Sequence, residues 1–136
     1  MLYSNNKLLI DKIAVDKIVK QFGTPAYCYS YNQLKENILE FQKNFKKINP
    51  LICFAIKANN NTKILKEIAT LGLGADVVSK GELMAALKSK IDPKKIVFSG
   101  VGKTYREIEF AAKKKVLLIN AESKSEIEII LKIARK

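Results

Sequence analysis

Short apolar runs alternate with amphipathic stretches along most of the chain, and each pair of segments occupies roughly twenty residues. The runs are rich in β-branched residues and lack polar interruptions, which predicts strands that are covered on both faces. Each run is followed by apolar residues at spacings of three and four, which predicts a helix with one buried face. The predicted strands are 51–56, 74–78, 95–99 and 116–119, and the predicted helices are 62–71, 80–91, 105–112 and 124–134.

The segment before these modules is less regular. An imperfect helical stripe over 13–22 ends at Gly23, and residues 26–29 predict a short strand. Ser30 is placed to cap a longer amphipathic helix over 31–48. We therefore predict two domains: an N-terminal helix and strand segment over 1–30, and a βα domain over 31–136.

Strands that alternate with helices form a parallel sheet, because each helix returns the chain to the edge where the strand began. No G-x-G-x-x-G follows the first strands, so a dinucleotide-binding sheet lacks its phosphate-binding motif. A barrel is favoured because polar residues end the strands, where barrel enzymes gather their chemistry. These residues are Lys57, Asp76, Ser99 and Asn120. The predicted fold is α/β: parallel βα repeats forming roughly the first half of a (β/α)8 TIM-type barrel, truncated because the full barrel takes about 250 residues.

Apolar residues make up 48% of the chain and charged residues 28%, as in soluble globular proteins. No apolar run reaches the roughly 18 residues of a membrane span, and the N-terminus lacks the apolar core of a signal peptide. We therefore expect a cytoplasmic protein with no membrane partner. Cys28 and Cys53 have no metal-ligand spacing and the chain has no histidine, so we expect structural thiols and no metal site.

The net charge of +12 raises the question of a nucleic-acid partner. The basic residues are 23 lysines and 2 arginines, and the lysines recur on the polar side of nearly every predicted helix. Arginine is the usual choice for bidentate contacts to phosphates and bases. The charge therefore indicates a solvated, lysine-rich surface, and we expect no nucleic-acid partner.

Lys57 ends the first apolar strand of the repeat, where alternation places it on the same face as Cys53 and Ala55. These small side chains leave room for a flat ligand. In a partly dry pocket the neutral form of an amine is favoured, and this form makes a Schiff base with an aldehyde such as pyridoxal phosphate. The alternative is a lysine that marks the strand end and extends into water. Periodicity alone favours that alternative, because lysine is so abundant in this chain.

Two acidic residues lie one module after Lys57. Asp76 ends the neighbouring strand, about 4.8 Å away, so both side chains can meet over one ligand. Its alternative role is an ion pair with Lys57, which a buried lysine would need. Glu82 has a stronger alternative role, because Ser79 and Glu82 have the spacing of a capping box. Its carboxylate would still lie near the mouth of the pocket.

Four motifs, spaced along nearly the whole chain, resemble the N-terminal part of diaminopimelate decarboxylase. Four motifs in the right order are far more specific than one lysine after a strand, so the resemblance favours a cofactor-binding role for Lys57. The motifs are F-G-T-P-A-Y at 22–27, F-A-I-K-A-N at 54–59, the segment 72–83 with its G-L-G-A-D-V-V-S, and I-V-F-S-G-V-G-K-T at 96–104.

The resemblance implies a pyridoxal phosphate barrel of the type shared with alanine racemase and ornithine decarboxylase, followed by a β-rich domain. It implies that Lys57 binds the cofactor covalently and takes part in catalysis, that Asp76 lies beside the cofactor, and that Glu82 is a nearby catalytic residue. The implied reaction converts meso-diaminopimelate, a small amino acid, to L-lysine and CO2, the last step of lysine biosynthesis. The alternatives are a related decarboxylase of arginine or polyamine precursors, and a non-catalytic cofactor-binding or assembly fragment.

The chain departs from the family in length. The family's stacking histidine, glycine-rich phosphate segment and second domain have no counterpart in these 136 residues. We therefore expect a fragment of the enzyme. Members of the family are homodimers, and the partner expected here is either a second copy or a complementary downstream chain that supplies the missing segments.

Overall fold

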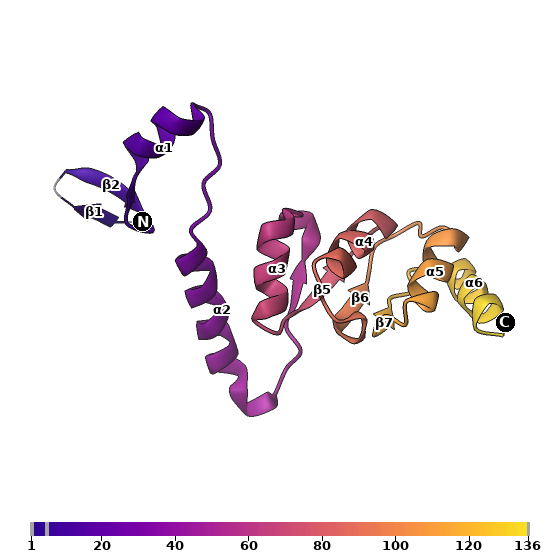
Figure 1. The fold of residues 1–136 in the computed structure, drawn as a ribbon. Coiled ribbons are helices and arrows are strands. Elements are labelled where there is room, and N and C mark those ends of the chain that lie inside the picture. Colours follow the sequence, from indigo (N-terminus) through magenta and orange to yellow (C-terminus); the bar gives the residue numbers. More distant parts are fainter. Residues whose placement is uncertain (1, 5, 136) are drawn as a thin grey trace. The chain divides into compact units, whose positions relative to one another are not determined.

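The computed structural model describes residues 2–4 and 6–135 (Figure 1). The chain divides into two compact units, Met1–Asn49 and Pro50–Lys136. Within the described residues, no helix has the length and apolar character that crossing a membrane requires.

The first unit begins with a small antiparallel sheet, which the sequence pattern did not predict. The hydroxyl of Ser30 donates to Asp11 Oδ1 at 2.6 Å, and the backbone N–H of Asn32 donates to Asp11 Oδ2 at 3.3 Å. These bonds tie the turn of the sheet to the start of the long helix. The elements are β1 Leu2–Ser4, β2 Lys7–Ile10, β3 Ile13–Ala14, α1 Val15–Phe22 and α2 Tyr31–Phe45, followed by the 3₁₀ turn Lys46–Ile48.

The predicted strand over residues 26–29 is wrong. These residues form an irregular connection between α1 and α2, and Tyr27 is 94% exposed. Aromatic residues suit a pleated surface, but a strand also needs a neighbouring strand to pair with. The described residues of the first unit offer this segment no such neighbour.

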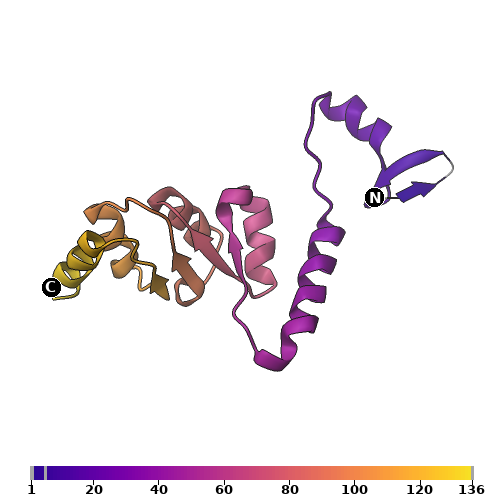
Figure 2. The same cartoon turned by 180° about the vertical axis from the view of Figure 1, so that it is seen from behind.

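The second unit is a four-stranded parallel sheet with the strand order β4-β5-β6-β7, and it confirms the predicted βα repeat. Each strand is followed by a helix, as Figures 1 and 2 show from opposite sides. The strands are β4 Cys53–Ala55, β5 Gly74–Val77, β6 Ile96–Phe98 and β7 Leu118–Ile119; the helices are α3 Thr62–Thr70, α4 Lys80–Lys88, α5 Tyr105–Lys113 and α6 Lys124–Ala134.

The two faces of this sheet differ in burial. One face carries Ala75, Val77, Ile96 and Phe98, all fully buried together with the apolar side chains of the helices. The register places a second set on the opposite face, where side chains are half-buried or exposed. The helices therefore cover one face only. We call the other the bare face; it carries Cys53, Ala55, Asp76, Val97 and Leu118.

Candidate functional site

Lys57 lies in the 3₁₀ turn Ile56–Ala58, directly after β4. The strand was predicted to reach Lys57, but it ends at Ala55, so the alternation that would place Lys57 beside Cys53 stops two residues earlier. Ile56 anchors the turn in the core, with only 1% of its surface exposed. The side chain of Lys57 is exposed. The partly dry pocket that we expected is thus not formed by the described residues alone.

Asp76 lies in β5 on the bare face, with its Cα paired to Ala55 on one side and to Val97 on the other. Its Oδ1 atom is buried and has no hydrogen-bond partner among the residues that the structure describes. The described residues form no ion pair between Asp76 and Lys57, so the ion-pair alternative for Asp76 is not realised. A buried carboxylate oxygen without a donor costs about 1–3 kcal/mol. The Oδ1 atom of Asp76 is therefore available as a hydrogen-bond acceptor.

The charge of Asp76 affects the pKa of the Cys53 thiol. Burial raises the pKa of this thiol, and the negative charge of Asp76 raises it further, since a thiolate beside a carboxylate is disfavoured. The register places both groups on the bare face, which accounts for this electrostatic influence.

Glu82 lies at the start of α4, and the helix-capping interpretation of this residue is confirmed in part. The backbone N–H of Glu82 donates to the hydroxyl of Ser79 at 3.2 Å. The carboxylate does not return to Ser79: its Oε2 accepts from the backbone N–H of Val78 at 2.8 Å. Because α4 contacts the turn Ile56–Ala58, Glu82 belongs to an element that lies against the turn that holds Lys57.

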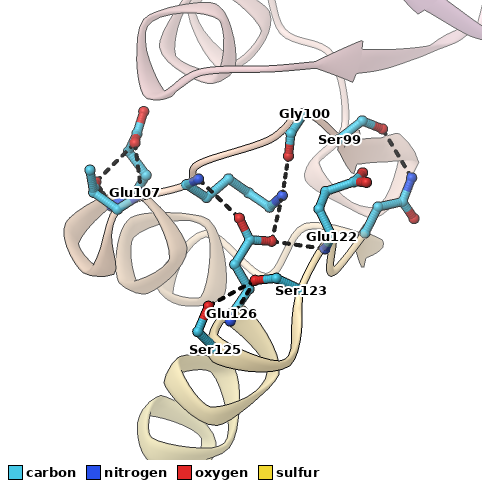
Figure 3. A network of polar contacts seen from close by, with 10 residues as sticks. Ser99, Gly100, Glu107, Glu122, Ser123, Ser125 and Glu126 are labelled. Carbon is cyan, nitrogen blue, oxygen red and sulfur yellow. Dashed lines mark hydrogen bonds and ion pairs between the residues drawn. The ribbon is translucent and has the colours of Figure 1, made fainter.

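The loops that follow β6 and β7 are linked by side chains. The amide of Asn120 donates to the hydroxyl of Ser99 at 3.1 Å (Figure 3). Both residues were predicted at the carboxyl edge of the sheet, and the structure brings them together there. Sequence reasoning missed a buried ion pair in the same region, between Lys103 and Glu126. The Ser-x-x-Glu spacing predicted that Glu126 lies in the first turn of a helix, but nothing local indicated its distant partner.

The fold and the positions of these residues define a class of protein. A parallel βα repeat carries a lysine and an unpartnered acid at the ends of neighbouring strands, as an enzyme site at the carboxyl edge would. The family model described as "Pyridoxal-dependent decarboxylase, pyridoxal binding domain" matches residues 31–136. The chain therefore belongs to the pyridoxal binding domain family of pyridoxal-dependent decarboxylases.

Relatives within that class are diaminopimelate decarboxylases. The enzyme of Aquifex aeolicus is 41% identical over 134 residues, which cover 98% of this chain and 31% of the relative. The enzyme of Helicobacter pylori is 46% identical over 120 residues, which cover 88% of this chain and 30% of the relative. The chain thus spans about a third of the length of these curated relatives.

Solved structures agree with this assignment. A crystal structure of a protein from Aquifex aeolicus superposes with a TM-score of 0.93 at 40% identity, over 98% of this chain and 33% of that one. The crystal structure of Helicobacter pylori diaminopimelate decarboxylase complexed with L-lysine gives a TM-score of 0.85 at 44% identity, over 89% of this chain and 31% of that one.

Proposed function

We propose that this chain is the cofactor-binding part of a diaminopimelate decarboxylase, a lyase that converts meso-diaminopimelate to L-lysine and CO2. The identity to curated diaminopimelate decarboxylases supports the reaction. The observation that carries the proposal for the site is the unpartnered, buried Oδ1 of Asp76, one strand away from the turn that holds Lys57.

The residues present fit pyridoxal phosphate at the bare face. Cys53 and Ala55 give this part of the face small side chains, so a flat ring finds room beside Asp76. Asp76 Oδ1 needs a hydrogen-bond donor, and the exposed amine of Lys57 is accessible to an aldehyde. When bound, pyridoxal phosphate supplies the electron sink that stabilises the carbanion left by loss of CO2.

Each of the three residues has a role in this proposal. Lys57 binds the cofactor covalently through its amine. Asp76 accepts a hydrogen bond and so orients the cofactor on the bare face. Glu82 uses one carboxylate oxygen to hold Val78, and the other is left to hold or move a proton near the turn of Lys57.

The remainder of the fold belongs to the proposal as well. Residues 31–136 form part of a TIM-type barrel, with 1–30 as a preceding segment, and further βα modules close the bare face and supply the phosphate site. Those modules lie on the same polypeptide or on a complementary chain, in a cytoplasmic enzyme that forms a homodimer. The support for the further modules is the share of the relatives that this chain covers, together with the apolar residues Val97 and Leu118 on the bare face.

A chimera tests the reaction and the site together. Residues 1–136 replace the matching third of the Helicobacter pylori enzyme, and release of CO2 from meso-diaminopimelate is measured. We expect activity that Lys57→Arg abolishes and that Lys63→Arg, on the exposed side of α3, leaves unchanged. A folded chimera that binds the cofactor but releases no CO2 would indicate the non-catalytic alternative, and one that prefers arginine would indicate the related decarboxylase.

A further inference from the structure

A buried ion pair joins the loop after β6 to the start of α6. Lys103 and Glu126 are each only 5% exposed, and Lys103 Nζ lies 3.0 Å from Glu126 Oε2. Glu126 Oε1 accepts from the backbone N–H of Lys103 at 3.0 Å, and Oε2 also accepts from the backbone N–H of Glu122 at 2.9 Å (Figure 3). Lys103 Nζ donates in addition to the carbonyl of Gly100. Both carboxylate oxygens of Glu126 are therefore engaged.

A contribution to stability does not by itself explain why a buried ion pair occupies this position. Removing two charges from water is costly, and a well-packed apolar pair of similar size is often as stable. Unlike an apolar pair, this ion pair makes directional contacts. Glu126 accepts from the backbone N–H of Lys103 and pairs with its Nζ, and Nζ also donates to the carbonyl of Gly100. It thus holds the loop 99–103 in one position.

That loop lies on the end of β5. The backbone N–H of Ser99 donates to the carbonyl of Val77 at 2.8 Å. Gly100 has φ +93°, and a Cβ atom added to it would lie 3.1 Å from Val78 Cβ and 3.3 Å from the Val78 carbonyl oxygen. The loop therefore contacts Val78 closely, and a side chain at Gly100 would press against Val78.

Val78 connects the loop to the proposed cofactor site. Its backbone N–H is the group that holds the carboxylate of Glu82. Val78 directly follows β5, and Asp76 lies two residues earlier, in that strand. We propose that Lys103 and Glu126 are positioning residues: by holding Gly100 against Val78, they fix the end of β5 and with it the carboxylates of Asp76 and Glu82. The role of Lys103 and Glu126 in positioning a cofactor site rests on the proposed function, whereas the coupling between the ion pair and Val78 does not.

Hydrogen exchange on this chain tests the coupling. The double variant Lys103→Met/Glu126→Leu replaces the pair with apolar side chains, so the fold is kept while the bonds to the loop are lost. We expect exchange at the Val78 amide to be at least about tenfold faster, with the amides of Leu65 and Ile68 in α3 unchanged, because the opening is local. Val78 exchange equal to wild type would overturn the proposal, as would equal acceleration at all three amides.

Two single variants serve as comparisons. Lys113→Met breaks an exposed pair with Glu109 on α5, in which the two charges are 3.3 Å apart, and is expected to leave Val78 unchanged. Glu126→Gln keeps an oxygen that accepts one backbone N–H, so its effect on Val78 is expected to be smaller than that of the double variant. An effect of Lys113→Met as large as that of the double variant would contradict the assignment to Lys103 and Glu126.

Labelling of Lys57 tests the consequence for the site. Pyridoxal phosphate is added, the adduct is reduced with borohydride, and labelled peptides are quantified by mass spectrometry. We expect the double variant to label Lys57 several-fold more slowly than wild type and Lys63 at the same rate. Equal labelling of Lys57 despite a loosened Val78 would overturn the positioning role. If wild-type Lys57 takes no label, the proposed function fails, whereas hydrogen exchange still decides the coupling.

Discussion

The surroundings of Asp76 identify the bare face of the sheet as a candidate binding site. Its neighbours on the bare face are small or apolar, and its buried Oδ1 meets no donor in the described part of the chain. A protein seldom leaves such an atom unpaired unless another group completes it. The effect of Asp76 on Cys53 gives a means of observing this charge without any cofactor.

Removing the charge of Asp76 is expected to activate Cys53. In a Cys28→Ser background, Asp76→Asn lowers the pKa of the Cys53 thiol, so more thiolate is present at pH 8 and reaction with a thiol reagent is several-fold faster. Glu109→Gln removes one charge on α5 and is the matched control. An unchanged rate for Asp76→Asn would mean that Asp76 and Cys53 do not face each other.

Gly74 is expected to tolerate no side chain. A Cβ atom at this position would lie 2.0 Å from the carbonyl oxygen of Lys95 and 2.9 Å from Cys53 Sγ. Gly74→Ala therefore forces β5 away from its neighbours, and the free energy of unfolding in urea should fall by about 2 kcal/mol or more.

Gly81 provides the comparison for Gly74. It lies in α4, where the nearest atom to an added Cβ is Ser79 Oγ at 3.8 Å. Gly81→Ala should therefore raise stability by about 0.5–1 kcal/mol through helix propensity. Equal losses for the two variants would contradict the packing described for β5.

At the scale of elements, the helix starts were predictable because their signals are local. Ser79, Thr104 and Ser123 each accept the expected hydrogen bond from the backbone three residues later. The hydrogen-bond partners of the acidic side chains in the first helical turns were less predictable. Of these three helices, α5 alone has the full capping box, in which Glu107 also accepts from its capping residue. Glu82 and Glu126 instead accept from the backbone N–H of the residue before the cap.

Glu107 makes the start of α5 sensitive to pH. Hydrogen bonds from the backbone N–H groups of Thr104 and Lys80 lower the pKa of its carboxyl group. A lowered pKa in the folded state stabilises the fold above the ordinary carboxyl pKa of about 4.3, and this contribution is lost as pH falls through the lower, folded-state value.

Glu107→Gln should therefore reduce the free energy of unfolding by about 0.5–1 kcal/mol at pH 7. The difference from wild type should shrink as the pH is lowered below about 4, as measured by urea titrations at several pH values. The exposed Glu128 supplies the control, since Glu128→Gln should change little at any pH. A loss that persists unchanged at pH 3 would contradict the role of the charge.

The strands were harder to predict than the helices. The strands of the parallel sheet have two to four residues, shorter than the apolar runs that predicted them, because pairing ends where the neighbouring strand ends. Lys57 therefore lies in the 3₁₀ turn after β4 and not in the strand itself. The antiparallel sheet at the N-terminus is not predictable from the sequence pattern, because its strands of two to four residues are too short to show alternation.

At the scale of the whole molecule, the order of the modules was the strongest prediction. Alternation of strands and helices predicted a parallel sheet, and the motifs pointed to a family that the comparisons confirm. The environment of Lys57 was not predictable in the same way. A pocket at the carboxyl edge of a barrel is built from all its modules, and this chain spans about a third of the length of its relatives.

We propose Lys57 as the residue that binds pyridoxal phosphate. The direct measurement is to incubate the chain with pyridoxal phosphate, reduce it with borohydride and map the label over all 23 lysines by peptide mass spectrometry. We expect Lys57 to be labelled first and at the lowest cofactor concentration, and Asp76→Asn to weaken this preference. Label spread evenly over the exposed lysines, with Lys57 no faster than Lys63, would contradict this proposal.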